Sequence, residues 1–453
     1  MQIIVPAASL VDQVIGKQKH KEGQTYRLMT YVIQCPVCDG VLLYHTLTCC
    51  MVLLTNEEAT HLSAQQELID NWFLVPEGHN DRKLCEQIRK TAQLFKPSAK
   101  TITGYTILTT TGCNARCFYC YEKGTTPVTM TPETAIKVAN YIIAHRGEDK
   151  VKISWFGGEP LYNVNVIDQI CSELKEHEVP FKSTMISNGY LFDAEMVQRA
   201  KDLWNLKNVQ ITLDGIEQTY NRIKRYIYGE VNAFERVLRN IQLLTDAGIR
   251  VQIRLNVDKH NIEEMSELVS LLHQRFGVNK RLIIYSRDLY CKRTLEDAEV
   301  LFDQRMMLEQ QIEELGYRGK QELQKEIKLG LCMADNDQNV VIVPDGHLGK
   351  CEHFIDSEFF GHIDSEEKNK EVLCRFKERP ADIEACATCP YYPQCFRLKV
   401  CEKNDCTPEL QKEHIYDIIM AMKDEYEKFL KKQNNDNAND NENQNNNEHE
   451  TEL

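Results

Sequence analysis

Between residues 101 and 330, six strand-like segments alternate with helical segments, and this alternation restricts the possible folds more than any other feature of the sequence. The strand-like segments read YTILTT, VKISWF, KSTMIS, NVQITL, RVQIRLNV and RLIIYS. Successive strands are expected to run parallel, because each helix carries the chain back along the sheet. The sequence therefore predicts an α/β fold, a partial (β/α)6 barrel over residues 101–330 with functional loops at the carboxyl ends of its strands.

The remainder of the chain differs in composition from this barrel. Residues 1–97 contain two β-rich segments followed by helical ones and predict an N-terminal α+β unit. Residues 331–410 are dense in cysteine and lack regular periodicity, which is typical of a small domain held together by metal clusters. Residues 411–432 predict a helix. The segment 433–453 has nine Asn, six acidic residues and no Lys or Arg, so a disordered tail is expected.

Composition narrows the class of protein. A net charge of −14 argues against a general nucleic-acid-binding protein, which needs a basic face. The sequence has no run of about 18 apolar residues, so no membrane span is expected. The N-terminus lacks the pattern of a secretory signal, and a cytoplasmic protein is expected. In that compartment the 18 cysteines are expected to be thiols or metal ligands rather than disulfides.

The first dense group of cysteines directly follows the first barrel strand. In TTTGCNARCFYCYEKG, Cys113, Cys117 and Cys120 have the spacing CxxxCxxC. Thiolates are the natural ligands of iron–sulfur clusters, and three of them leave one iron of a four-iron cube uncovered. A zinc site and three unrelated thiols are the alternatives. Structural zinc takes four protein ligands, and no fourth Cys or His follows within about twenty residues.

This segment resembles the signature of the radical S-adenosylmethionine (SAM) superfamily, including the aromatic Tyr119 before the last cysteine. The resemblance implies that the three thiolates hold a [4Fe–4S] cluster whose free iron chelates SAM, with Tyr119 at the cofactor site. Reductive cleavage of SAM would then give methionine and a 5′-deoxyadenosyl radical that abstracts hydrogen. In such enzymes the protein orients the cofactor and excludes water.

Two further motifs resemble the SAM pocket of that superfamily. The second strand ends in WFGGEP, and the resemblance places Gly157, Gly158 and Glu159 against the methionine amino group. Glycine at these positions would let the backbone approach a ligand closely. The third strand ends in SNG, where the resemblance assigns Ser187 and Asn188 to the ribose and the methionine carboxylate.

Two charged residues on later strands are further candidates. Asp214, in LDG at the end of the fourth strand, is either a polar cap or a substrate-facing carboxylate, and it is the one candidate catalytic residue. On the fifth strand, Arg254 and Asn256 share one face because side chains alternate along a strand. A buried Arg needs a carboxylate partner. The methionine carboxylate and an internal salt bridge are the alternatives for Arg254.

The second cysteine-rich region contains two spacing patterns. Cys332, Gly346 and Cys351 read Cx13Gx4C, CATCPYYPQC reads CxxCx5C, and two more cysteines follow. This resembles the SPASM domain, which carries auxiliary four-iron clusters, although Lys399 stands where that family usually has a cysteine. Family pairing implies one cluster on Cys386, Cys389, Cys395 and Cys406, and a second on Cys332, Cys351 and Cys401. The fourth position of the second cluster is open, or taken by Cys374 or a non-cysteine group. A zinc-ribbon-like domain is the alternative to this interpretation.

A smaller group of cysteines lies in the N-terminal unit. Cys35 and Cys38 form a CxxC on one strand, and Cys49 and Cys50 follow on the next. Four thiols across a hairpin could bind zinc, but cysteines in such positions are more often small buried hydrophobic residues.

These observations lead to one functional hypothesis and two alternatives. The hypothesis is a cytoplasmic radical SAM/SPASM maturase that crosslinks or epimerises a ribosomally made peptide. The N-terminal unit is similar to winged-helix-like domains that grip leader peptides by adding a strand to a sheet edge. The expected partners are a precursor peptide or protein and an electron donor such as flavodoxin or ferredoxin, with no nucleic acid or membrane. The alternatives are a maturase that forms formylglycine in a sulfatase, and a non-catalytic metal-binding scaffold.

Overall fold

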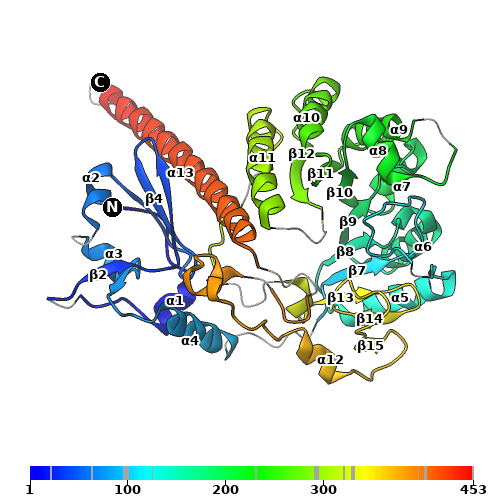
Figure 1. Ribbon diagram of the computed structural model, residues 1–453, viewed down its shortest axis with the longest axis horizontal. Helices are drawn as coiled ribbons and strands as arrows, with labels where there is room; N and C mark the ends of the chain where they lie inside the picture. Colours follow the sequence, from blue (N-terminus) through cyan, green and yellow to red (C-terminus); the bar gives the residue numbers. More distant parts are fainter. Residues whose placement is uncertain are drawn as a thin grey trace.

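The fold divides into a barrel and an N-terminal unit, which lie at opposite ends of the long axis in Figure 1. The computed structural model describes residues 1–20, 23–62, 65–94, 101–124, 126–229, 232–289, 295–319, 322–327, 332–395, 397–401 and 406–450. The boundary expected between residues 97 and 101 falls in the segment 95–100, outside the described residues.

The barrel is built on a sheet of nine strands. The order across it is β12-β11-β10-β9-β8-β7-β13-β14-β15, and β7 to β12 are all parallel. These six strands are β7 (Gly104–Leu108), β8 (Val151–Phe156), β9 (Phe181–Ser187), β10 (Leu206–Leu213), β11 (Arg250–Val257) and β12 (Leu282–Asp288). The prediction of six consecutive βα units forming a partial barrel is confirmed.

Helices cover one face of this sheet, as Figure 1 shows. They are α5 (Pro132–His145), the short helix η2 (Pro160–Asn163), α6 (Val164–Glu176), α7 (Ala194–Asp202), α8 (Glu217–Lys224), α9 (Ala233–Asp246), α10 (Ile262–Phe276) and α11 (Leu295–Glu314). Alternate strand residues such as Val151, Ile153 and Trp155 are buried against them in the main hydrophobic core. This alternation fixes the register, because a shift by one residue would turn the apolar side chains away from the helices.

The opposite face of the sheet carries mostly polar side chains and is less buried. In β9, Lys182, Thr184 and Ile186 are exposed while their neighbours are buried. Deeper on the same face, Tyr285 donates a hydrogen bond to Gln210 across two strands at 2.7 Å. This polar face is the interior of the partial barrel, so the strand ends that border it are where a polar ligand could be held.

The cysteine-rich region extends the barrel sheet at its β7 edge. The short helix η3 (Met333–Asp335) leads into β13 (Asn339–Ile342), β14 (His347–Gly349) and β15 (Gly361–His362), followed by α12 (Lys370–Arg375), η4 (Glu384–Thr388) and η5 (Tyr392–Gln394). β13 pairs with β7 in parallel, and β13 and β14 form a hairpin whose turn contains Gly346 at φ 93°. The glycine of Cx13Gx4C thus serves a left-handed turn position that favours Gly.

The N-terminal unit contains two small sheets and four helices among its described residues. One sheet has the order β1-β5-β4-β3, and the other pairs β2 with β6. The elements are β1 (Gln2–Val5), α1 (Ser9–Val14), β2 (Tyr26–Leu28), β3 (Val32–Val37), β4 (Gly40–His45), β5 (Met51–Leu54), α2 (Asn56–Thr60), α3 (Gln66–Asp70), β6 (Leu74–Pro76) and α4 (Asp81–Leu94). An α+β unit was predicted here, although β1 and α1 were not.

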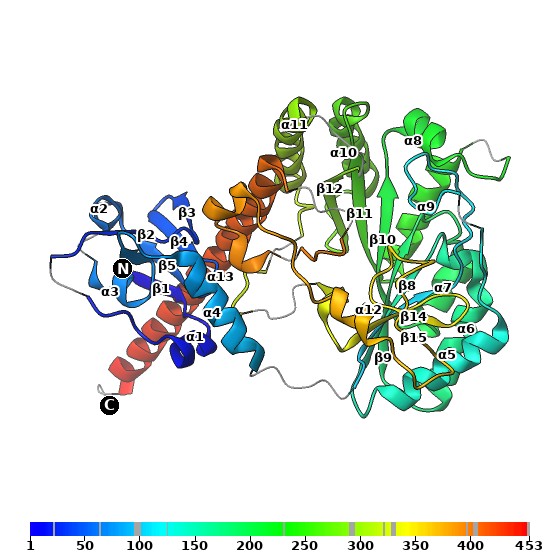
Figure 2. The ribbon, with the colours of Figure 1, turned by 60° about the horizontal axis from the view of Figure 1, so that its bottom comes forward.

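The N-terminal sheet shares its core with the last helix of the chain, α13 (Pro408–Glu450). Ile33 and Tyr44 of the sheet belong to the same buried cluster as Ile418, Met422 and Tyr426 of α13. Figures 1 and 2 both show α13 lying alongside this sheet. Residues 1–97 were expected to be a separate unit. Instead their four-stranded sheet buries one face with a helix that is distant in sequence, because so small a sheet cannot enclose a core alone.

The end of α13 also differs from the expected one. The helix was predicted over residues 411–432, whereas its backbone runs to Glu450. Asn and Asp are weak helix formers, but extending an existing helix adds one hydrogen bond per residue without a new nucleus. None of the described helices combines the length and apolarity that crossing a lipid bilayer requires.

Candidate cofactor site at the carboxyl ends of the strands

The three thiols of the first cysteine motif lie in the loop that follows β7. Cys113, Cys117 and Cys120 are all partly buried there. Burial, and next the charge of Glu159, raise the pKa of the Cys113 thiol to about 12, and the other two thiols contribute. A thiol in such surroundings, like that of Cys113, is a poor thiolate unless a cationic group neutralises it. The donor set therefore fits a positively charged iron–sulfur core.

The glycines of WFGGEP hold the end of β8 against this cysteine loop. A Cβ on Gly157 would lie 2.1 Å from the carbonyl oxygen of Thr110, and one on Gly158 would lie 2.5 Å from that of Gly112. The N–H groups of Gly158 and Glu159 donate to these same two carbonyl oxygens, each at 3.0 Å. The close approach that requires glycine is therefore to the cysteine loop, whereas an approach to a ligand was expected.

Glu159, Ser187 and Asn188 lie together at the strand ends. The Glu159 carboxylate is fully buried and accepts hydrogen bonds from Ser187 Oγ at 2.9 and 3.1 Å and from the Asn188 N–H at 2.8 Å. Burial raises the pKa of Glu159 to about 7, although these donors oppose the shift. The group is a buried acceptor that an ammonium or amine of a ligand would stabilise in its charged form.

Asn188 also connects this carboxylate to the cysteine loop. Its Nδ2 donates to Asn114 Oδ1 at 2.7 Å and lies 3.9 Å from Cys113 Sγ. Asn114 is itself fully buried. Asn114 was not predicted as a site residue, because the only sequence feature that marks it is its position directly after Cys113.

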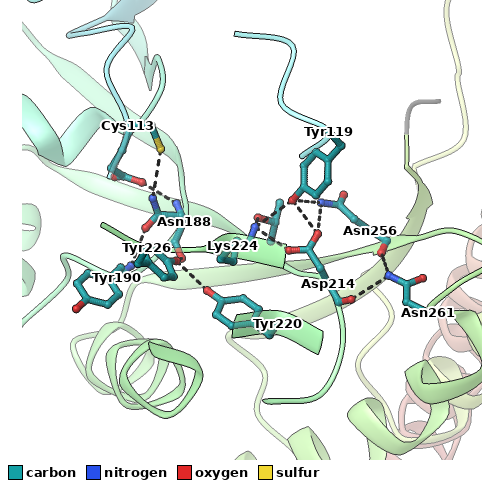
Figure 3. Close-up of polar contacts among 12 residues, drawn as sticks. Cys113, Tyr119, Asn188, Tyr190, Asp214, Tyr220, Lys224, Tyr226, Asn256 and Asn261 are labelled. Atoms are coloured by element: carbon teal, nitrogen blue, oxygen red, sulfur yellow. Dashed lines mark hydrogen bonds and ion pairs between the residues drawn. The ribbon is translucent and has the colours of Figure 1, made fainter. Parts of the chain in front are cut away.

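Figure 3 shows a second polar group, in which Tyr119 and Asp214 meet. Tyr119 donates from its hydroxyl to Asp214 Oδ1 at 2.7 Å, and Asn256 Nδ2 donates to the same oxygen at 2.9 Å. Lys224 Nζ forms an ion pair with Asp214 Oδ2 at 2.8 Å, without hydrogen-bond alignment, and donates to the Tyr119 hydroxyl at 3.1 Å. Asp214 was expected to cap the next segment or to face a substrate. In the structure it is the acceptor of an internal network that ties the cysteine loop to β10 and β11.

Lys224 completes this network from the last residue of α8. Its side chain is buried and also donates to Thr212 Oγ1 at 2.6 Å. Burial alone lowers the pKa of Lys224, but Asp214 outweighs it and holds the pKa well above its usual value. Lys224 was not predicted as a site residue, because a lysine in the last turn of a helix is typical of a solvent-exposed position.

Arg254 lies on β11, on the polar face of the sheet, with Asn256 two residues further on. Its Nε is buried and has no hydrogen-bond partner among the described residues. No ion pair of Arg254 is found in the described part of the chain either, although its charge reaches Tyr285. A buried guanidinium N–H without a partner is costly, so this side chain is suited to receive an anionic ligand.

The remaining cysteines of the second region form two groups in space. Cys386, Cys389, Cys395 and Cys406 line one cavity. Cys332 and Cys401 lie close enough to Cys351 to add to the rise of its pKa, to about 12, which burial causes first and Glu352 second. These are the same two groups that family pairing implied.

Among the described residues, Glu352 is a candidate for the fourth position of the group at Cys332, Cys351 and Cys401. Cys374 is exposed on α12. Glu352, next to Cys351, has its Oε2 buried without a hydrogen-bond partner, and its charge raises the pKa of both Cys351 and Cys332. Lys399, at the position where the family usually has a cysteine, pairs with Glu378 at 2.8 Å.

The N-terminal cysteines do not form a metal site in the structure. Cys35, Cys49 and Cys50 are buried, whereas Cys38 is exposed. Nowhere in the described part of the chain do three or more His, Cys, Asp or Glu side chains converge tightly enough to hold one metal ion.

Comparison with known proteins agrees with this geometry. Residues 107–272 match the radical SAM superfamily. This stretch, with the cysteine loop, WFGGEP and SNG at its strand ends, is therefore a radical SAM domain. The radical SAM domain takes a [4Fe–4S] cluster and SAM as its cofactors.

Within this class the chain is similar to proteins of several activities. It is 26% identical over 200 residues to the Fe-coproporphyrin III synthase of Methanosarcina barkeri (44% of this chain, 46% of that protein). It is 27% identical over 171 residues to the sporulation killing factor maturation protein SkfB of Bacillus subtilis (36% and 38%). The chain thus spans about half or less of the length of these relatives.

A solved structure of anSMEcpe with bound AdoMet and the Kp18Cys peptide shares the fold. It aligns with a TM-score of 0.53 at 15% identity, over 73% of this chain and 99% of that one. The radical SAM fold with a cysteine-rich C-terminal part is thereby confirmed.

Proposed function

We propose that the chain is a radical SAM/SPASM maturase that modifies a ribosomally made peptide. The observation that carries this proposal is the meeting of Glu159, Ser187, Asn188 and the cysteine loop at the strand ends. The bound cluster and SAM would supply a carbon radical able to abstract hydrogen from an unactivated C–H bond. Cys113, Cys117 and Cys120 would hold the cluster.

The chain's own residues would orient SAM from three sides. Glu159 would accept from the amino group of the methionine moiety, and Arg254 would pair with its carboxylate. Ser187 and Asn188 already hydrogen-bond Glu159 and would position it for that contact. The network of Tyr119, Asp214 and Lys224 would hold the cysteine loop in place, and Asp214 would then act as a structural group rather than as the substrate-facing carboxylate considered from sequence.

The second cysteine region would hold two auxiliary [4Fe–4S] clusters. One would be ligated by Cys386, Cys389, Cys395 and Cys406, which share a cavity. The other would be ligated by Cys332, Cys351 and Cys401, with the Glu352 carboxylate as the non-cysteine fourth ligand. Such clusters need an electron donor, for which flavodoxin or ferredoxin is suited. They also need a reducing compartment, and the cytoplasm fits the many free thiols.

A peptide substrate is supported by relatives and by the N-terminal unit. SkfB is a maturation protein, and anSMEcpe was solved with a bound peptide. In the N-terminal sheet, β3 is an edge strand that pairs only with β4 among the described strands. An extended leader peptide could add to such an edge.

A decisive experiment uses the full chain, reconstituted with iron and sulfide without oxygen. With SAM and a reductant, it should release 5′-deoxyadenosine and change peptides encoded near its gene. Mass spectrometry would detect a crosslink as a loss of hydrogen, and solvent deuterium uptake would detect epimerisation. Oxidation of a sulfatase-derived Cys or Ser peptide, with no change in the nearby peptides, would favour formylglycine formation. Failure to cleave SAM at all would leave only the metal-binding scaffold.

A further inference from the structure

The N-terminal unit contacts the loop between two cysteines of the second region. Thr46, just after β4, donates from its hydroxyl to the carbonyl oxygen of Pro390 at 2.6 Å. The buried Gln394 donates from its Nε2 to the Tyr44 hydroxyl at 2.8 Å and to the carbonyl oxygen of Thr46 at 3.0 Å. Pro390 and Gln394 both lie between Cys389 and Cys395. The conformation of this loop is thus set in part by side chains that precede it by about 350 residues.

Arg89 of α4 makes the most direct contact of this kind. Its Nη2 donates to the carbonyl oxygens of Tyr392 and Pro393, at 2.7 and 2.8 Å. Its guanidinium also lies over the Tyr392 ring, 5.0 Å from the centroid. Two hydrogen bonds and a cation–π contact hold one side chain against the middle of the loop.

Arg89 also lines the cavity that the four cysteines share. Cys386, Cys389, Cys395 and Cys406 surround this cavity together with Arg89, Arg379 and Arg397. Asp382, the one carboxylate among the described residues of the lining, forms an ion pair with Arg82. Three guanidinium groups around four thiols form an electropositive wall, which suits the net negative charge of a cube bearing four thiolates.

We propose that the N-terminal unit is part of an auxiliary iron–sulfur site, with Arg89 as the positioning residue that fixes the Cys389–Cys395 loop and raises the reduction potential of the cluster bound there. The inference rests on the proposed auxiliary cluster. Reduction adds one electron to an already anionic cube, and a nearby cation stabilises the reduced form more than the oxidised form. Groups around metal ligands commonly alter metal affinity by about 10- to 100-fold when removed.

The test compares full-length variants in a background in which Cys113, Cys117 and Cys120 are replaced by Ala, so that only auxiliary clusters give a signal. Arg89→Gln removes the charge, and Arg89→Lys keeps it. Lys90→Gln is the matched control, because this lysine is exposed on the same helix and does not line the cavity. Iron and sulfide content and an electron paramagnetic resonance (EPR) redox titration are measured, and Cys389→Ala identifies the relevant signal.

Arg89→Gln should shift the midpoint potential of that signal to lower values, or lose about four iron atoms per chain. In Arg89→Lys and Lys90→Gln, the midpoint potential of this signal should stay near that of the parent protein. An unchanged potential and iron content in Arg89→Gln, or an equal change in Lys90→Gln, would overturn the inference. If Arg89→Gln is insoluble, Thr46→Val takes its place, because it removes the hydroxyl that contacts Pro390. Unchanged iron content and an unchanged EPR spectrum in this variant would overturn the inference. A parent without a signal dependent on Cys389 would instead refute the auxiliary cluster itself.

Discussion

Lys224 Nζ lies 2.8 Å from Asp214 Oδ2, and the two side chains are only 2% and 1% exposed. The pair joins the end of β10 to the end of α8, and the Tyr119 hydroxyl joins both to the cysteine loop. The desolvation of both charges is offset only while both partners are present. The placement of the cysteine loop thus depends on a buried ion pair.

Lys224→Met should therefore destabilise the protein strongly. It leaves Asp214 buried without its cation, which costs about 3–5 kcal/mol. Adding Asp214→Asn should recover part of this loss, because Asn removes the charge and keeps an oxygen acceptor for Tyr119. Urea unfolding of Lys224→Met, of Asp214→Asn and of the double variant provides the measurement. If the double variant lost the sum of the two single effects, the residues would not be coupled.

Replacing Cys113, Cys117 and Cys120 together with Ala should abolish SAM cleavage but leave auxiliary iron bound. Total iron should fall by about one four-iron cluster, because only this group of thiols is lost. Iron analysis and chromatographic detection of 5′-deoxyadenosine test this. SAM cleavage at the parental rate would contradict the assignment of these ligands.

Arg254→Ala should weaken SAM binding more than it destabilises the fold. Its buried Nε has no partner in the described structure, so no internal salt bridge is lost. A charge-assisted contact to the ligand is worth about 2 kcal/mol or more. Arg250→Ala is the control, since Arg250 is exposed at the start of the same strand. A large drop in the melting temperature without SAM would indicate a structural role for Arg254 instead.

Glu159 should make stability without ligand depend on pH. Burial raises its pKa to about 7 from 4.5, so between these values the folded state holds a proton that the unfolded state releases. Stability should therefore fall as pH rises through this window, by up to about 1.4 kcal/mol per pH unit, and level off above pH 7. Glu159→Gln should lack this component. Unfolding curves from pH 5 to 8 that run parallel for both proteins would contradict it.

Deleting residues 433–453 should change neither SAM cleavage nor iron content. The core contacts of α13 with the N-terminal sheet come from residues up to Leu430, which the deletion keeps. The deleted segment has only two apolar residues, Ala438 and Leu453, and so little apolar surface to bury. Enzyme assays and iron analysis of the truncated chain would reveal any contact of this tail with the site.

Local patterns in the sequence determined the barrel and the ligands within it. Strand and helix periodicities reflect which face of each element is buried, so the six βα units could be located without a structure. The spacing around Cys113 and the motifs ending at Glu159 and Asn188 lie at single strand ends, and the spacing from Cys332 to Cys351 spans the hairpin of β13 and β14. Close spacing along the chain forces such residues to remain near one another after folding.

Tertiary structure alone decided the contacts between distant segments. The sequence predicted Asp214 as a candidate but gave no sign that Lys224 neutralises it, since burial of a charge depends on its surroundings in space. Likewise, the apolar face of α13 could have packed against any exposed apolar surface. Only the tertiary structure shows that it packs against the N-terminal sheet. The position of Arg89 beside the downstream cysteines follows from that packing. Hydrophobic burial is non-directional, so a sequence shows which surfaces must be covered but not which segment covers them.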